Sequence, residues 1–258
     1  MLHTEHHPGQ ESGPHLLLLH GSLCNQAQWV LNLEALGQVC RPLTAELLGH
    51  GESAAPTDPA AYTASAYVDY IEQIREHHGI ERWYLCGYSL SAGLVMHYAL
   101  RHPERVEGLI ITNSMSAFAP EKLRAAWLRS GPDVIRAIET RGRAYIDKLP
   151  MHPRFATSLP AAVYEPLLAR CALHDPQGIG LTIAHTVPDA CVRPRLAELD
   201  SRILLLQGVH EKRFAEHATF AATRLRRLTQ VRVDAGHAVN MQQADAFNDH
   251  VRQFLRDA

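Results

Sequence analysis

The pattern of apolar segments in this chain predicts a fold of the α/β class. We expect a mostly parallel twisted sheet, helices on both of its faces and an inserted helical cap. Short continuous apolar runs, which are typical of buried parallel strands, alternate with segments of helical periodicity. Turn-forming residues follow several of these runs, as expected where a strand passes into a loop. The alternation stops between residues 114 and 194 and then resumes, which indicates an insertion between two strands of the sheet.

The first half of the chain supplies four of the predicted strands. Residues 1–14 are polar and contain two prolines and two glycines, so we expect an irregular arm there. The apolar runs predicted to be strands cover residues 16–19, 39–44, 82–86 and 106–112. Helical spacing of the apolar residues predicts helices over residues 28–36, 63–76 and 89–101.

The second half consists of the insertion and the rest of the sheet. Residues 114–194 are mostly of helical character, rich in arginine and alanine, and broken by prolines. An insertion at this point usually covers the carboxyl edge of a parallel sheet. We therefore predict a helical cap over 114–194 and a core domain formed by 1–113 and 195–258. The alternation resumes with strands predicted over 202–207 and 230–234 and helices over 214–224 and 244–256.

Composition and charge argue against several functional classes. The chain has 258 residues, 46% of them hydrophobic, and a formal net charge of −2. No basic cluster suggests a nucleic-acid partner, and no apolar run approaches the ~20 residues that would span a membrane. The amino-terminal residues do not resemble a signal peptide, and the five cysteines are odd in number and scattered. We therefore expect reduced thiols and a cytoplasmic location, with a small molecule as substrate. The sequence is also compatible with a homo-oligomer.

The segment GYSLS (residues 87–91) lies where the third predicted strand passes into a helix. A sharp turn at Ser89 would raise its hydroxyl above the edge of the sheet, where a nucleophile is needed. Small residues two before and two after the serine let strand and helix approach closely, and Gly87 and Ser91 occupy these positions. The usual pattern, G-x-S-x-G, has glycine where this chain has Ser91.

Four predicted turns carry reactive side chains, and the turns at the carboxyl ends of parallel strands meet at one edge of a sheet. They contain His20-Gly21-Ser22-Leu23, Ser89, Gly208-Val209-His210-Glu211 and Ala235-Gly236-His237-Ala238. A serine, an acid and a histidine in this order are typical of a Ser-acid-His relay. In such a relay His237 takes the proton of Ser89 and later gives it to the leaving group. The backbone amides of Leu90 and Ser22 are the expected donors of an oxyanion hole.

Together these motifs make the chain similar to the α/β-hydrolase superfamily over nearly its whole length. The matching segments are His20-Gly21 with Trp29, Gly49-His50-Gly51-x-Ser53, Gly87-x-Ser89, Gly208 through Phe214, and Gly236-His237. The resemblance implies Ser89 as nucleophile, His237 as base and an acid in the loop after Gly208. The family loop commonly reads glycine, two residues, aspartate, and that last position is Glu211 in this chain. We therefore expect the triad Ser89, Glu211 and His237, with Asp234 as the alternative acid.

The resemblance also bears on neighbouring residues and on cofactors. We interpret Glu46, His50 and Ser53 as scaffold residues of the loop that they share. Neither a metal nor an organic cofactor is expected for this mechanism.

The predicted cap should decide substrate specificity. Five of its aromatic residues are candidates for the pocket or for the cap's own core. They are Phe118, Trp127, Tyr145, Phe155 and Tyr164, and we expect core positions for most of them.

Three functions are open at this point. The first is a serine hydrolase that forms an acyl-enzyme with a small carboxylic ester or a related carbonyl substrate. Residues 87–91 and 208–214 also resemble the branch of the superfamily that holds carbon–carbon bond hydrolases. That branch includes a menaquinone-pathway lyase, in which the same triad acts by abstracting a proton. A non-catalytic small-molecule receptor is the third, and the presence of both Ser89 and His237 argues against it.

Overall fold

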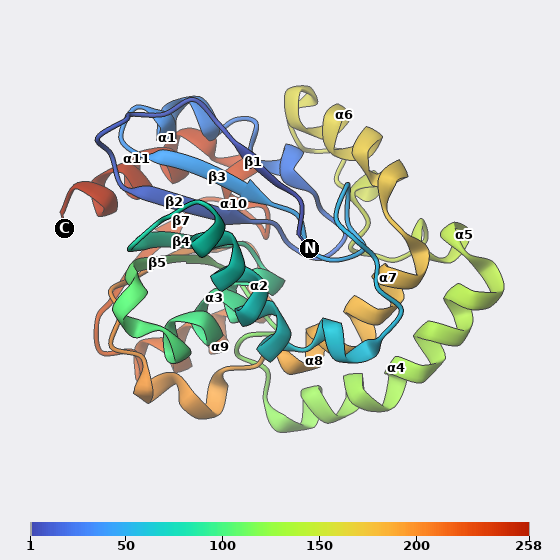
Figure 1. The fold of residues 1–258 in the computed structure, drawn as a ribbon. Helices are drawn as coiled ribbons and strands as arrows, with labels where there is room; N and C mark the ends of the chain where they lie inside the picture. The colour runs from blue at the N-terminus through green and yellow to red at the C-terminus, as the bar shows by residue number, and fades with distance from the viewer. Residues whose placement is uncertain (1, 258) are drawn as a thin grey trace.

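The computed structural model describes residues 2–257, which form a seven-stranded sheet in the order β1-β3-β2-β4-β5-β6-β7 (Figure 1). The strands are β1 (Thr4–His6), β2 (His15–Leu19), β3 (Arg41–Ala45), β4 (Trp83–Gly87), β5 (Val106–Thr112), β6 (Ile203–Gly208) and β7 (Leu228–Val233). All neighbouring strands pair in parallel except β1, which pairs antiparallel with β3. The predicted α/β fold with a mostly parallel sheet is therefore confirmed.

Helices cover both faces of the sheet, because alternate residues of the buried strands point to opposite sides. One core contains Leu16 and Leu18 with Phe247, and the other contains Leu17 and Leu19. In Figure 1 the first face is covered by α1 (Leu33–Gly37) and α11 (Ala244–Arg256), with α10 (Val239–Gln242) just before α11. The opposite face is covered by α2 (Ala64–His77), α3 (Leu90–Arg101) and α9 (Ala215–Ala222).

Two predictions in the first forty residues were wrong in part. The expected irregular arm contains the edge strand β1, whose backbone pairs with β3 although its side chains show no apolar alternation. The helix predicted over 28–36 is divided into a 3-10 turn, η1 (Gln26–Trp29), and α1. Asn32 lies between them and is fully buried, with its amide donating hydrogen bonds to Asn240 and Asn248. Hydrophobic periodicity cannot predict these partners, because they are distant from Asn32 in the sequence.

The segment between β5 and β6 is helical, as predicted. Its helices are α4 (Glu121–Arg141), α5 (Arg143–Ile146), α6 (Ala161–Arg170), α7 (Pro176–Leu181), a π-helical turn η6 (Thr182–Thr186) and α8 (Val187–Asp189). Figure 1 shows α4 to α7 grouped together beside one end of the sheet. Gly178 of α7 approaches the core so closely that an added Cβ would lie 2.6 Å from the Cα of Gly49. Across residues 2–257, no helix is both long and apolar enough to cross a membrane. All five cysteines are free thiols.

Candidate active site

Ser89 occupies a strained turn between β4 and α3. Its φ of 53° and ψ of −113° lie in a region that residues with a Cβ rarely adopt. The turn is tight, because a Cβ added to Gly87 would lie 2.4 Å from the Ser91 carbonyl oxygen. The hydroxyl of Ser91 donates a hydrogen bond to the His20 carbonyl. Serine in place of the usual glycine therefore joins this turn to the loop after β2.

A continuous hydrogen-bond chain joins Ser89, His237 and Glu211, which follow β4, β7 and β6. The Ser89 Oγ lies 2.9 Å from Nε2 of His237, and Nδ1 of His237 lies 2.8 Å from Oε2 of Glu211. A carboxylate only accepts, so Nδ1 carries the ring proton and Nε2 can accept the serine proton. The loops after β6 and β7 pack closely, because a Cβ on Gly208 would overlap the Gly236 carbonyl oxygen.

Asn113 is a member of this site that sequence reasoning missed. Its side-chain amide donates to the Glu211 carboxylate at 2.7 Å and exchanges hydrogen bonds with the backbone of Gly208. Burial opposes ionisation of the Glu211 carboxyl, but the hydrogen bonds from His237 and Asn113 hold its pKa below the usual value. The position directly after β5, at the same edge as Ser89, was the available signal.

Asp234, the alternative acid, contacts a different histidine. Its carboxylate lies 2.7 Å from Nε2 of His210, and both side chains are largely exposed. Glu211 is therefore the carboxylate that the fold brings to His237.

The two expected oxyanion donors lie beside Ser89. Within residues 2–257, neither the amide of Ser22 nor that of Leu90 donates a hydrogen bond to a protein acceptor, whereas neighbouring amides of both loops do. The loop of Ser22 approaches the serine closely, because a Cβ on Gly21 would lie 3.1 Å from the Cβ of Ser89. Leu90 is the first residue of α3, where amides have no partner inside the helix. Both amides are thus free to receive a substrate oxygen.

Comparison with known proteins agrees with this architecture. A family model described as the alpha/beta hydrolase fold matches residues 14–138. Carboxylesterase YbfK of Bacillus subtilis (strain 168) is 25% identical over 260 residues, covering 96% of this chain and 82% of the relative. This chain is a member of the α/β-hydrolase superfamily.

Two further proteins are similar to this α/β-fold hydrolase. The 2-succinyl-6-hydroxy-2,4-cyclohexadiene-1-carboxylate synthase of Serratia proteamaculans (strain 568) is 29% identical, covering 96% of this chain and 95% of the relative. The solved structure of MenH from S. aureus has a TM-score of 0.85 at 18% identity, covering 100% of this chain and 99% of that one. The second likeness concerns the fold alone.

The hydrolase has a pocket of about 760 Å³ that opens onto Ser89 and His237. Most of its lining is apolar and includes Met115, Trp127, Val134, Leu159, Ile183 and Met241. Trp127 is the only one of the five aromatic candidates of the insertion that lines this pocket. Phe118 is buried in the core beside the sheet, whereas Phe155 is 56% exposed. Within residues 2–257, no group of three or more His, Cys, Asp or Glu side chains is arranged so that it could hold a metal ion.

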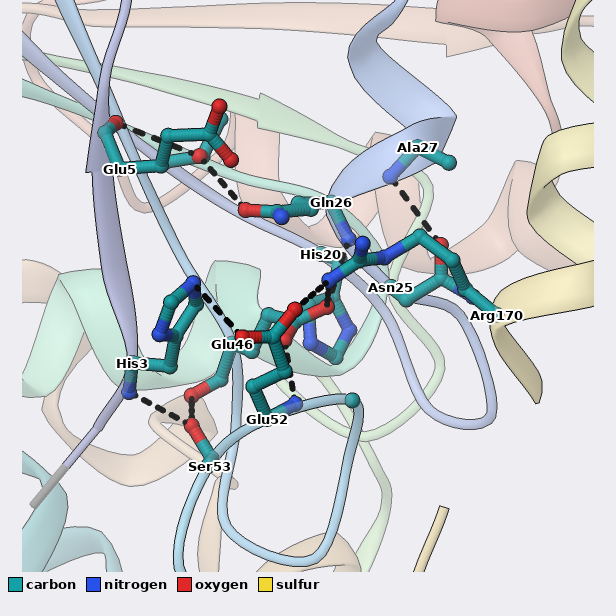
Figure 2. Close-up of polar contacts among 12 residues, drawn as sticks. His3, Glu5, His20, Asn25, Gln26, Ala27, Glu46, Glu52, Ser53 and Arg170 are labelled. Carbon is teal, nitrogen blue, oxygen red and sulfur yellow. Dashed lines mark hydrogen bonds and ion pairs between the residues drawn. The ribbon is translucent and has the colours of Figure 1, made fainter. Parts of the chain in front are cut away.

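Figure 2 shows a network of polar contacts around Glu46, whose residues do not line the pocket. The Glu46 carboxylate is fully buried and accepts hydrogen bonds from the amides of Gln26 and Glu52, at 3.3 and 2.7 Å. The Arg170 guanidinium, at the end of α6, lies 3.6 Å from the Glu46 carboxylate and 3.0 Å from that of Glu52. The Ser53 hydroxyl donates to the Glu46 carbonyl. These contacts agree with the scaffold role predicted for Glu46 and Ser53.

Three buried histidines, His20, His50 and His174, form a second cluster, which does not line the pocket. Their rings follow one another with centroid separations of 5.0 and 5.1 Å. Each ring accepts a hydrogen bond from one backbone amide, so that nitrogen carries no proton and the ring is neutral. Burial lowers the pKa of His20 and of His174 to about 4, and that of His50 well below its ordinary value.

We expect the free energy of unfolding to fall as the pH is lowered from about 6.5 toward 4. Unfolded histidines bind a proton near their ordinary pKa of 6.5, whereas the folded rings of His20 and His174 stay neutral down to about pH 4. The unfolded state therefore binds more protons in this window. The stability is fully present above pH 6.5, and each of these two rings should account for a loss of roughly 3 kcal/mol by pH 4. Urea unfolding at about pH 7, 5.5 and 4.5 measures the loss.

Replacing His174 by glutamine is the control, since it should remove about one proton from the pH dependence. Other histidines with a pKa lowered by burial, such as His97 and His152, act in the same direction. An unfolding free energy that stays constant from pH 7 to about pH 4.5 would contradict the neutral, buried state of these rings.

Proposed function

We propose that this protein is a carboxylic ester hydrolase in which Ser89 is the nucleophile, His237 the general base and Glu211 the group that orients His237. The observation that carries the proposal is the hydrogen-bond chain through the three side chains, with distances of 2.9 and 2.8 Å. The similarity to carboxylesterase YbfK supports the same class of reaction.

In the acylation step His237 Nε2 takes the Ser89 proton while Oγ forms a bond to the carbonyl carbon of the ester. The carbonyl oxygen becomes negatively charged and accepts hydrogen bonds from the amides of Ser22 and Leu90. Glu211 stabilises the positive charge on the imidazole. As the tetrahedral intermediate collapses, the bond to the alcohol oxygen breaks, and His237 gives its proton to that oxygen. The products are the free alcohol and an acyl-enzyme on Ser89.

Deacylation repeats these steps with water as the nucleophile. His237 removes a proton from the water, whose oxygen adds to the acyl carbon in the same oxyanion hole. Collapse of this second intermediate breaks the bond to Ser89 Oγ, and the proton on His237 returns to that oxygen. The carboxylic acid leaves, so one water is consumed for each ester cleaved and neither metal nor redox chemistry enters the balance.

The pocket lining supports esters with apolar substituents. Trp127, Val134 and Ile183, all from the insertion, line the pocket together with Met241 from the core. We propose that residues 114–194 act as the cap domain over a core of 1–113 and 195–258. A substrate that fills this space would exchange water for apolar side chains, at roughly 25 cal/mol for each Å² buried. Polar or multiply charged substrates should therefore be turned over less well.

A carbon–carbon bond hydrolase or lyase is the second candidate function. It is favoured by the 29% identity to the Serratia synthase over 95% of that relative. In this reaction His237 would abstract a proton from the substrate directly or through Ser89. Arg213 lines the same pocket and would face a substrate carboxylate.

A substrate panel separates these functions. The purified protein is assayed with p-nitrophenyl esters of increasing acyl length, an acyl thioester and a vinylogous diketone of the ring-cleavage type. We expect ester hydrolysis with kcat/KM on the order of 10⁴ M⁻¹ s⁻¹ or higher, increasing with acyl length until the pocket is full. The Ser89→Ala variant, run beside it, reports hydrolysis that does not depend on the site.

Each remaining outcome has a defined meaning. Turnover of the diketone but not of the esters would move the assignment to the carbon–carbon bond hydrolases. Tight binding of panel compounds without turnover, measured by calorimetry, would indicate a receptor and exclude the proposed reaction.

A further inference from the structure

The backbone of residues 20–23, which we call the oxyanion loop, is held by buried side chains on both sides of Ser22. The Ser91 hydroxyl donates to the His20 carbonyl, and the His20 imidazole donates to the Gly21 carbonyl at 2.7 Å. The Gly21 amide donates to the side chain of Gln28 at 3.3 Å. The loop is thus tied down on the side that precedes the amide of Ser22.

Leu23, on the other side of Ser22, is held by two of the buried histidines. Its amide donates to Nε2 of His50 at 3.1 Å, and its carbonyl accepts a hydrogen bond from Nε2 of His174 at 3.2 Å. Leu23 has a φ of 60°, a left-handed conformation that costs a residue with a Cβ roughly 1 kcal/mol or more. The two imidazoles therefore support a conformation that the chain does not favour by itself.

The direction of the hydrogen bond from His174 follows from its other partner. The Gly51 amide donates to Nδ1 of His174 at 3.1 Å, so the ring proton is on Nε2 and points to the Leu23 carbonyl. His174 is 1% exposed and belongs to the insertion, directly after the 3-10 turn η5 (Cys171–Leu173). The Arg143 guanidinium donates to its backbone carbonyl at 2.6 Å. Hydrogen bonds at both ring nitrogens therefore fix the imidazole, and Arg143 fixes the backbone that carries it.

We propose that His174 is a positioning residue, by which the insertion holds the oxyanion loop so that the Ser22 amide points at the reacting carbonyl. The inference rests on the proposed hydrolysis at Ser89. Without the imidazole, the buried Leu23 carbonyl loses its nitrogen donor. The Cys171 thiol, 3.7 Å away, is a weak donor and lies closer to the Leu167 carbonyl, at 3.2 Å. Leu23 can then leave its left-handed conformation, and the preceding peptides turn with it. His174 acts through this loop, because it does not line the pocket.

Two polar substitutions separate the two hydrogen bonds of His174. In His174→Gln, the terminal amide reaches about as far as Nε2 and can still donate to Leu23. In His174→Asn, the shorter side chain places its oxygen near the Nδ1 position and can accept only from Gly51. His174→Leu removes both hydrogen bonds at similar volume. Comparing the three variants therefore tests whether catalysis depends on the hydrogen bond to Leu23 or on the hydrogen bond from Gly51.

We expect kcat for a p-nitrophenyl ester to fall roughly 10- to 100-fold in His174→Leu and His174→Asn, with KM changed less than about 3-fold. His174→Gln should keep kcat within about 5-fold of the unaltered protein. A trifluoromethyl ketone that adds to Ser89 places its oxyanion in the same hole. Its Ki should rise in parallel with the fall in kcat, whereas the affinity for the corresponding methyl ketone should not change.

His152→Leu is the matched control. His152 is a buried histidine of the same insertion, 5% exposed, and its ring contacts Arg154 and Asp147 instead of the oxyanion loop. This variant should lose stability without the selective fall in kcat. The proposal is overturned if His174→Leu keeps its kcat, if His174→Gln falls as far as His174→Asn, or if His152→Leu loses kcat equally. If the unaltered protein hydrolyses no ester, the proposed function fails first and the inference fails with it.

Discussion

Replacing Ser89 by alanine is expected to lower kcat/KM for ester hydrolysis by roughly 10⁴- to 10⁶-fold, because the hydroxyl that contacts the general base His237 is lost. The Ser89 hydroxyl lies 2.9 Å from Nε2 of His237, in the geometry required for proton transfer. The fold should be unaffected, since alanine keeps the Cβ and removes only an oxygen. Steady-state kinetics, with thermal unfolding as the check on folding, measures both effects.

Covalent labelling tests the same assignment independently. A fluorophosphonate should modify the unaltered protein once, and peptide mapping should place the adduct on Ser89. The Ser89→Ala variant should remain unlabelled. Ser65→Ala, which changes an exposed serine in contact with Arg101, should label normally. An adduct mapped to another residue, or turnover by Ser89→Ala within about 10-fold of the unaltered protein, would remove Ser89 from the mechanism.

Replacing Glu211 by alanine is expected to lower kcat by roughly 10³- to 10⁴-fold. The carboxylate accepts the Nδ1 proton of His237 at 2.8 Å, which keeps Nε2 free to accept the serine proton. Without it the imidazole can adopt the other tautomer, in which Nε2 carries the proton and cannot act as a base. The positive charge that forms on the ring also loses its partner.

Glutamine at position 211 should be less damaging than alanine. The amide of Asn113 and the ring of His237 both donate to the same carboxylate oxygen. A glutamine can place its amide oxygen there and keep the tautomer, so Glu211→Gln loses only the charge. We expect a decrease in kcat that is smaller than that of the alanine variant, because the tautomer is kept and only the charge that stabilises the imidazolium is lost.

Asp234→Asn is the control for the acid. This exposed carboxylate pairs with His210, so its replacement should leave kcat within about 2-fold of the unaltered protein. If Asp234→Asn lowers kcat as much as Glu211→Ala, or if Glu211→Ala retains full activity, the acid must be assigned elsewhere.

The parts of the fold that could be predicted are those whose signals are local. The apolar run over 106–112 and the amphipathic pattern over 244–256 coincide with β5 and α11. Both elements bury their side chains against the sheet or within it, so burial and sequence periodicity are the same property. The helix predicted over 28–36 was wrong in part because buried Asn32 is held by Asn248, a partner distant in the sequence.

The sequence by itself determined an α/β chain with a serine at a strand-to-helix turn and a histidine at a later strand end. Hydrophobic periodicity and turn-forming residues act over a few positions, so they specify elements and their ends. Only the tertiary structure decided that Glu211 and not Asp234 meets His237, and that Asn113 joins them. It also decided that His174 of the insertion bonds the loop of Ser22. These contacts join residues that are far apart in the chain. The order and packing of whole strands and helices bring such residues together.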